Sequence, residues 1–427
     1  MKEAFSIMSK KGVNRWIVLF VLALTCGLIY QLPYLRYSYY DQMIAAFAVT
    51  NVQLGTFMTA YGLGSLPCYI LGGIFAMKFS DKALLPAGTI LTGAAGLWFA
   101  TFPSYGATLF IHFFWAFSTS LIFWPAAINF VRGLGSSSEQ GRLYGLFEGM
   151  RGICATIIGL GIVALFNAAM SELAGLRTVI LTYSAINIGL GVILFFFVPN
   201  NKEEKKALAI AAGQSSLLKG FGAALKMPIT WAATGIVFFT MMVFDCLGYT
   251  TPYLTGCLGA TAAFAAAFGT IRTWGLQFVG GTTGGIIADK IGSSAKTLIG
   301  GFAIIVIGFV ILNLLPVKSS MVWPAAIFIL IFGTALCVNR GVYFAVLDEA
   351  RVPANINAAV VGIVSAIGFT PDAFIYTIIG YFLDTYPGTL GYQITFWMAA
   401  ACGLGGLICA LIAVRIIKKD KAQAAAE

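Results

Sequence analysis

The sequence predicts an all-α membrane protein in which 12 transmembrane helices form two pseudo-symmetric six-helix bundles. The first observation is composition: 59% of the 427 residues are hydrophobic and 10% are charged, unlike a soluble domain. The second is a set of twelve apolar stretches, each able to supply the roughly 20 residues of a spanning helix. Their centres lie near Thr25, Leu63, Leu91, Ser120, Ile158, Ile188, Thr240, Thr270, Ile305, Leu330, Ile367 and Gly403. The third is an internal repeat.

Three short motifs recur in the same order at a separation of about 210 residues. The pairs are residues 284–292 with 72–79, 30–35 with 249–254, and 129–133 with 337–341. A repeat of half the chain predicts two homologous halves. We therefore expect an N-terminal bundle over 1–199, a cytoplasmic linker over 200–228 and a C-terminal bundle over 229–427.

Lysine and arginine residues gather on one side of the predicted membrane. Most of the 26 basic residues lie before the first span, after an even-numbered span or after the last span. The opposite loops contain only Arg36, Arg177 and Lys318. Because cytoplasmic loops carry the excess of positive charge, we expect both termini in the cytoplasm and the chain in the bacterial inner (plasma) membrane.

The net charge of +10 reflects this topology and does not indicate a nucleic-acid partner. The eight cysteines show neither metal-site nor disulfide-framework spacing, and we expect them to be reduced packing residues. The sequence also lacks a nucleophile–base constellation, a metal-binding cluster and a phosphate-binding glycine loop. It therefore indicates neither an enzyme nor a protein with a cofactor or a bound metal.

Ionisable side chains inside the predicted spans are the first candidates for a functional site, because each costs about 3 kcal/mol near the bilayer centre. They are Glu148 and Arg151 in the fifth span, Asp245 in the seventh, Arg272 in the eighth and Asp372 in the eleventh. Glu148 and Arg151 share one helix face, so they can pair. The pair is either structural or an inner gate that opens when substrate or a proton replaces one partner.

Arg272 is the first candidate for holding an anion, because a guanidinium stays charged and binds carboxylate, phosphate or sulfonate through two hydrogen bonds. The alternative is a salt bridge to Asp245 or Asp372 without substrate contact. Glu148 or either aspartate could also couple transport to protons, since burial and neighbouring charges change the protonation of a carboxyl group. The sequence leaves these alternatives open.

Aromatic and polar residues complete the predicted site. Prolines at 33 and 252 interrupt the first and seventh spans, because proline removes a backbone donor. The tyrosines beside them belong either to bent helices or to outer gates over a central cavity. His112, the only histidine, is either packed or a proton relay. The predicted substrate contacts are Arg272, Arg151, Tyr30, Tyr34, Trp124, Tyr249, Asn339 and Tyr343.

After the eighth span the sequence reads Gly285-x-x-x-Asp289-Lys290-x-Gly292. With the twelve repeated spans and the central linker, this motif resembles the major facilitator superfamily of secondary transporters. Residues 139–145, 339–345 and 380–388 are similar to the YihN-type permeases within that superfamily. The resemblance covers the whole chain.

The resemblance implies a central cavity lined mainly by spans 1, 4, 7 and 10, with help from spans 2, 5, 8 and 11, and alternating access by rocking of the bundles. It also implies a cytoplasmic motif that latches the inner face. The expected motif residues are Gly285, Asp289, Lys290, Gly292 and Arg142. Met77 stands where the first-half copy should have an acid, so the latch is expected mainly in the second half.

The function expected from these features is secondary active transport of a small polar, anionic organic solute, coupled to protons. Acidic sugars, sulfonates, carboxylates and organophosphates all suit the two buried arginines. A neutral sugar, a zwitterion or proton-independent exchange with a counter-solute remains open, because the five buried charges sum to −1. A carrier-like receptor that senses solute without transport is the alternative of another class. The expected partners are the solute, the proton or counter-solute and the lipid bilayer, and we expect a monomer.

Overall fold

The computed structural model describes residues 14–135, 139–201 and 216–426, and every regular element in these ranges is a helix. The predicted all-α class is therefore confirmed. Residues 202–215 of the predicted linker lie outside the described residues. The side chain of Arg142 also lies outside them.

Eight helices are long and apolar enough to cross a membrane by themselves. They are Tyr105–Gly133, Leu143–Asn167, Glu172–Phe197, Pro228–Gly256, Ser294–Leu314, Ser319–Val342, Ala359–Thr385 and Thr389–Lys419. One further pair, Tyr40–Phe47 and Asn51–Cys68, passes the same test only when its two helices are taken together, and it is bent by 103°. The other predicted spans are the short helix α2 (Arg15–Ile29), α5 (Asp81–Phe99) and the helical stretch over 262–291. Glycine, threonine and charged residues lower the hydropathy of the last two.

The chain divides into two compact units by its internal contacts. Unit 1 contains Met1–Gly213 and Ala262–Phe278, and unit 2 contains Gln214–Thr261 and Val279–Glu427. The division places the first part of the eighth predicted span in unit 1. The predicted bundle boundaries, which assign that part to the second bundle, stay a prediction.

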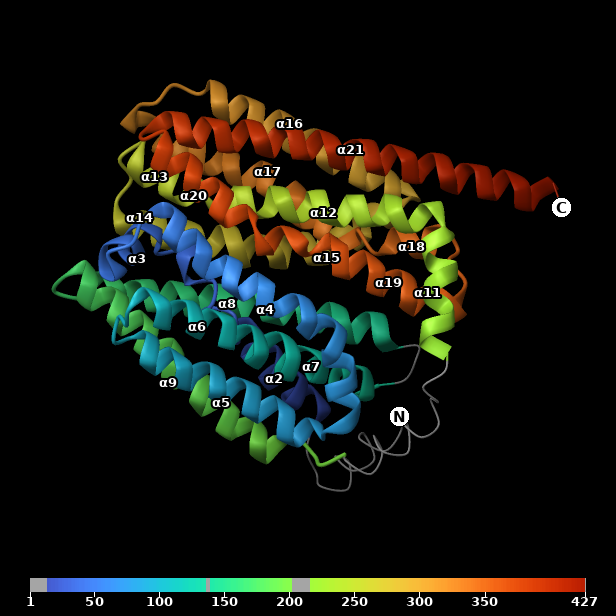
Figure 1. The fold of residues 1–427 in the computed structure, drawn as a ribbon, viewed down its shortest axis with the longest axis horizontal. Coiled ribbons are helices and arrows are strands. Elements are labelled where there is room, and N and C mark those ends of the chain that lie inside the picture. Colours follow the sequence, from blue (N-terminus) through green and yellow to red (C-terminus); the bar gives the residue numbers. More distant parts are fainter. Residues whose placement is uncertain (1–13, 136–138, 202–215, 427) are drawn as a thin grey trace. The chain divides into compact units, whose positions relative to one another are not determined.

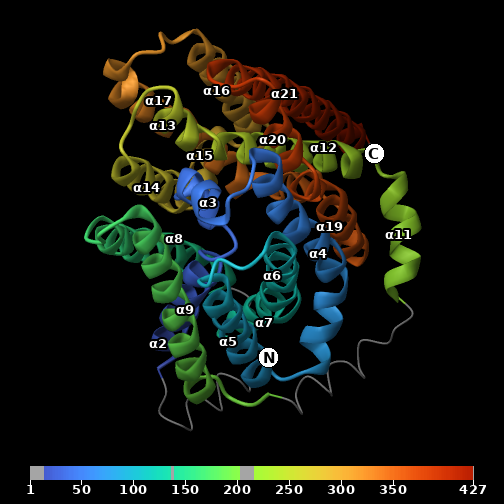
Figure 2. The same ribbon diagram turned by 60° about the vertical axis from the view of Figure 1, so that its left-hand side comes forward.

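Unit 1 consists mainly of long antiparallel helices (Figures 1 and 2). Besides α2 and α5, its elements are η1 (Leu35–Tyr37), α3 (Tyr40–Phe47), α4 (Asn51–Lys78), α6 (Tyr105–Ala116), η2 (Phe117–Phe123), α7 (Trp124–Gly133), α8 (Gln140–Asn167), α9 (Glu172–Phe197), α14 (Ala262–Thr270) and η4 (Ile271–Gly275). The segments η2 and η4 are π-helical. π-Helical turns inside a helix occur often at functional sites.

Glycines allow the helices of unit 1 to approach closely, as is typical of membrane helices. At Gly27, an ideal Cβ would lie 2.6 Å from the carbonyl oxygen of Arg151, so α2 and α8 pack backbone against backbone. The resulting core contains Cys26, Phe123 and Phe147, all fully buried. This contact brings the C-terminal end of α2 beside the charged residues of α8.

We expect Gly88→Ala to lower the free energy of unfolding by about 1 to 3 kcal/mol, the usual cost of overpacking. A Cβ at Gly88 would lie 2.7 Å from the carbonyl oxygen of Ser118 and 2.9 Å from Cβ of Phe123. Thermal unfolding in detergent measures the effect. Gly189→Ala is the control, because a Cβ there meets nothing within 4 Å. Equal melting temperatures for the two variants would contradict the close packing of α5 on η2.

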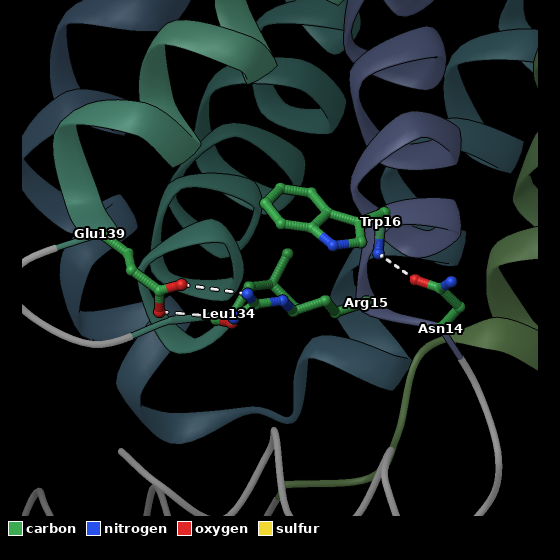
Figure 3. Close-up of polar contacts among 5 residues, drawn as sticks. All are labelled: Asn14, Arg15, Trp16, Leu134 and Glu139. Atoms are coloured by element: carbon green, nitrogen blue, oxygen red, sulfur yellow. Dashed lines mark hydrogen bonds and ion pairs between the residues drawn. The ribbon is translucent and has the colours of Figure 1, made fainter.

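An ion pair connects the starts of α2 and α8 (Figure 3). Nη2 of Arg15 lies 3.0 Å from Oε1 of Glu139, and Nη1 donates to the carbonyl oxygen of Leu134 at 3.5 Å. Asn14 caps α2 by accepting a hydrogen bond of 2.9 Å from the backbone nitrogen of Trp16. The pair is 23% and 35% exposed, so we expect it to stabilise the unit by less than about 1 kcal/mol.

Unit 2 contains a second group of long helices, in which α16 and α12 each pack along α21 (Figure 1). Its elements are α11 (Ser216–Lys226), α12 (Pro228–Gly248), α13 (Thr250–Gly256), most of α15 (Leu276–Ile291), α16 (Ser294–Leu314), η5 (Ser319–Met321), α17 (Val322–Val342), α18 (Ala345–Glu349), α19 (Ala354–Gly368), η6 (Thr370–Ala373), α20 (Ile375–Thr385) and α21 (Thr389–Ala426). Helix α11 lies across the ends of α12 and α19 in both views (Figure 2).

The first and seventh spans are interrupted near their prolines, as predicted. Helix α2 ends at Ile29, ahead of Pro33, and α12 ends at Gly248, ahead of Pro252. Pro252 itself lies inside the next helix, α13, after a break at Tyr249. In both spans the proline has no N–H to donate to the carbonyl oxygen four residues earlier, which belongs to Ile29 or Gly248. The structure adds a third interruption at Pro371, where η6 separates α19 from α20 in the eleventh span. The sequence analysis missed that one.

Candidate functional site

Glu148 and Arg151 of the fifth predicted span form an ion pair on α8, as predicted. Nη1 of Arg151 donates to Oε1 of Glu148 at 3.2 Å and to Oε2 at 3.0 Å. The Arg151 side chain is 13% exposed and that of Glu148 is 37% exposed. The ion pair therefore stands at the edge of the core, with its acid more accessible than its base.

Two aromatic rings flank the Arg151 guanidinium. Its Cζ lies 5.5 Å from the ring centroid of Tyr30 and 5.3 Å from that of Trp124, within the range of cation–π attraction. Tyr30 caps the C-terminal end of α2, and Trp124 follows η2 directly. The interruption of the first span and the π-helical turn in the fourth thus position the rings around Arg151.

The aromatic contacts continue from Tyr30 along the loop after α2. Tyr30 lies 6.3 Å from Tyr34, and Tyr34 stacks on Tyr37 with centroids 5.5 Å apart and planes 9° apart. Tyr61 of α4 meets Tyr34 edge-on at 5.4 Å. We refer to Trp124, Tyr30, Tyr34 and Tyr37 as the aromatic row.

Arg272 stands at the other end of the aromatic row, on η4. Its Nη2 donates to the carbonyl oxygen of Tyr37 at 3.3 Å and to Oγ1 of Thr273 at 3.1 Å, and its Cζ lies 5.5 Å from the Tyr37 ring. It is 3% exposed. Unit 1 therefore brings five predicted contacts into one continuous series, with an arginine at each end and Tyr30, Tyr34 and Trp124 between them.

Unit 2 holds the two predicted aspartates together. Asp245 on α12 is fully buried, and the Tyr376 hydroxyl of α20 donates to its Oδ1 at 2.6 Å. Asp372 on η6 is 8% exposed and lies close enough to Asp245 for the two carboxyl groups to interact. Arg340 on α17 interacts electrostatically with both acids. Its Cζ lies 4.0 Å over the ring of Phe244.

The other predicted contacts of unit 2 serve different neighbours. The Tyr249 hydroxyl donates to the carbonyl oxygen of Tyr376 at 3.1 Å, which supports the aspartate site. Asn339 is fully buried against Gly301 of α16, and Tyr343 packs edge-on against Phe344 with centroids 4.7 Å apart. A substrate contact for Asn339 or Tyr343 stays a prediction.

His112 is packed, in agreement with the first of its two alternatives. It is 1% exposed, its Nδ1 lies 2.9 Å from the carbonyl oxygen of Thr108, and it stacks on Phe57 at 5.2 Å. A proton relay would need a connection to other exchangeable groups. The structure instead surrounds the ring with Phe57, Phe99 and Trp115.

The cytoplasmic motif ends helix α15. Gly292 adopts φ +71°, a left-handed conformation that favours glycine, and its backbone nitrogen donates to the carbonyl oxygen of Asp289. Asp289 and Lys290 are exposed, and a Cβ at Gly285 would meet nothing within 4 Å. The geometry explains why glycine stands at 292, and the latching role of the charges stays a prediction.

The sequence analysis missed three residues of these sites: Tyr37, Arg340 and Tyr376. Arg340 lies within the repeat motif 337–341 that matches residues 129–133, so this repeat was an available signal. Tyr376 follows Asp372 by four positions, a spacing that places two residues on one face of a helix. Here Asp372 lies on η6 and Tyr376 on α20, and the Tyr376 hydroxyl donates to Asp245 of another helix, so helical spacing by itself could not predict that contact.

Comparisons with known proteins agree with this architecture. The family model described as Major Facilitator Superfamily matches residues 12–371. The inner membrane protein YihN of Escherichia coli (strain K12) is 33% identical over 417 residues, covering 97% of this chain and 99% of that protein. The inner membrane protein YqcE of the same organism is 32% identical over 407 residues, covering 94% and 95%.

Solved transporters share the fold at low sequence identity. A bacterial homolog of the human lysosomal transporter Spinster, in an inward-facing, unoccupied conformation, superposes with a TM-score of 0.73 at 16% identity, covering 95% of this chain and 98% of that one. A D-xylose–proton symporter gives 0.72 at 17% identity, covering 94% and 97%. The predicted fold class, with its resemblance to YihN-type proteins, is confirmed. On the extent of the family match and the full-length similarity to YihN and YqcE, the chain belongs to the Major Facilitator Superfamily of membrane transporters.

Proposed function

We propose that this transporter moves a small anionic organic solute across the inner membrane by alternating access, driven by protons. Acidic sugars, sulfonates, carboxylates and organophosphates are the candidate solutes. Arg151 binds the anionic group, the aromatic row contacts the rest of the solute, and the aspartates of unit 2 carry the proton. Localisation in an inner membrane rests on the names of the two relatives.

The observation that carries the proposal is the hydrogen bonding of Arg151. Both carboxylate oxygens of Glu148 accept hydrogen bonds from the same nitrogen of Arg151, Nη1. In the usual bidentate pair, the two oxygens would accept from two different guanidinium nitrogens. Among the described residues, the buried Nε of Arg151 has no hydrogen-bond acceptor. A buried donor without an acceptor costs about 1 to 3 kcal/mol. An oxygen of an anionic solute would remove that cost.

Arg272 supports the same site from its other end. Its guanidinium is more deeply buried than that of Arg151 and already donates to Tyr37, which fixes the end of the aromatic row. We therefore assign it to positioning the tyrosines first, and to attracting an anion through its charge. Tyr34 and Trp124 are partly exposed and offer ring faces on which the apolar face of a sugar can stack.

A screen of the purified protein for thermal stabilisation tests the solute class, because a ligand that binds only the folded state raises Tm. The compounds are acidic sugars, sulfonates, carboxylates, organophosphates and neutral sugars. One anionic class should raise Tm in the wild type and not in Arg151→Gln. Arg415→Gln is the matched control, since Arg415 is exposed on α21. Stabilisation by neutral sugars alone would contradict the proposed anionic solute and indicate a neutral one.

Uptake of the stabilising compound into proteoliposomes then separates a carrier from a receptor. An inward proton gradient should drive accumulation of the solute above its external concentration. Binding without uptake would indicate a receptor with a carrier fold. Uptake that requires internal solute and ignores the proton gradient would indicate an exchanger.

A further inference from the structure

The two carboxyl groups of unit 2 form a site of their own. Asp245 lies on α12, and Asp372 lies on η6, where the eleventh span is interrupted. Both are buried, with 0% and 8% exposure, and the packing of α12 against η6 brings the two carboxyl groups within range of electrostatic interaction. Among the described residues, Oδ1 of Asp372 has no hydrogen-bond donor. Two neighbouring ionised carboxylates in an apolar span would repel each other strongly.

A proton bound to one of the two acids removes this repulsion, because that acid is then neutral. With both acids ionised, the cluster of Asp245, Asp372 and Arg340 carries a net charge of −1, and with one proton bound it is neutral. A proton on Asp245 also supplies an O–H donor for Asp372. Groups that interact this closely bind their protons as a pair, so the proton belongs to both residues.

Two tyrosines hold the pair in place. The Tyr376 hydroxyl donates to Oδ1 of Asp245 at 2.6 Å, and the Tyr249 hydroxyl donates to the backbone oxygen of Tyr376 at 3.1 Å. Tyr376 is fully buried. A short bond from a fixed donor stabilises the ionised form of Asp245.

We propose that Asp245 and Asp372 share a single proton, and that Tyr376 and Arg340 stabilise the one negative charge that remains. The inference rests on the proposed proton-driven transport and deepens it by naming the proton site. Water on one side of the membrane gives the proton to a carboxylate oxygen of one acid, and the resulting O–H group donates a hydrogen bond to the other acid. The proton then leaves to water on the other side of the membrane. Each transport cycle then carries one proton through this site.

The surrounding ionisable groups are few. Arg340 approaches from α17, Tyr376 from α20 and Tyr249 from the junction of α12 and α13. Cys246, the neighbour of Asp245 on α12, is fully buried and faces Cys402 of α21. Of the groups named here, the two acids and Arg340 set the charge of the site.

Infrared difference spectroscopy of the reconstituted protein tests the proposal without a transported solute. Spectra in acidic and alkaline buffer, repeated in D2O, report the C=O band of a buried protonated carboxyl group. The wild type should show one such band at neutral pH. Both Asp245→Asn and Asp372→Asn should lose it, because each leaves a lone acid beside Arg340. Tyr376→Phe should retain the band at a shifted frequency.

Asp289→Asn is the control, because Asp289 is exposed at the end of α15 and should not contribute to the band. Thermal unfolding of each variant shows whether it is folded. A band lost in only one of the two aspartate variants would assign the proton to a single acid and overturn the sharing. Loss of the wild-type band on replacing choline chloride with sodium chloride would overturn the proposal in favour of a sodium site. Failure of solute uptake with the shared band intact would contradict the transport proposal alone.

Discussion

Replacing Arg151 with alanine is expected to weaken binding of the anionic solute about 100-fold. Two charge-assisted hydrogen bonds of about 1.5 kcal/mol each would be lost, and each 1.4 kcal/mol is a factor of ten in affinity. The flanking rings of Tyr30 and Trp124 would lose their cation–π partner as well. The concentration of solute that gives half-maximal thermal stabilisation measures the change.

Two further variants distinguish binding from structural support. Arg151→Lys keeps the charge and loses the planar fork, so its affinity should lie between wild type and alanine. Glu148→Gln removes the negative charge at Nη1, so anion binding should be retained or become tighter. Arg415→Ala, on the exposed face of α21, should match the wild type. Weaker binding in Glu148→Gln, with the fold intact, would mean that the pair acts as one structural unit and that Arg151 is not the anion ligand.

Replacing Asp372 with asparagine is expected to abolish proton-driven accumulation while exchange of solute across the membrane continues. An amide cannot take up and release the proton, so the carrier can still change its conformation but cannot gain energy from the gradient. The solute concentration inside proteoliposomes should then approach the outside concentration, where the wild type exceeds it. Labelled solute measures both activities in the same preparation.

Asp245→Asn should behave in the same way, because the two acids act as a pair. Asp289→Asn is the control for a carboxylate outside the site, and it should accumulate solute like the wild type. Accumulation that survives in both Asp245→Asn and Asp372→Asn would exclude these residues as the proton carriers. Glu148 would then become the candidate coupling acid.

The sequence predicted some residues of the candidate site but few of the contacts between them. Ionisable residues in apolar spans are rare and costly, so Glu148, Arg151, Asp245, Arg272 and Asp372 could be selected from hydropathy alone. The pairing of Glu148 with Arg151 also follows from local spacing on one helix. The partners of the other three could not be predicted, because they come from helices far apart in the chain.

Asp372 shows why local patterns were insufficient. The apolar pattern around Thr370-Pro371-Asp372 predicts a continuous span, whereas the structure interrupts the α-helix there and places the acid near Asp245. Arg340 was noticed only as part of a repeat, and its role beside two acids depends on the packing of α17. Arg272 was the first choice for the anion, but its burial against Tyr37 favours Arg151 in that role.

The sequence by itself determined the membrane environment, the helical class and the family, because hydropathy and motif spacing are properties of the linear chain. Only the tertiary structure decided which charges face each other and how the aromatic row lies between two arginines. Those contacts depend on close approaches at glycines such as Gly27 and on π-helical turns such as η4. Both displace side chains in ways that no single-helix periodicity encodes.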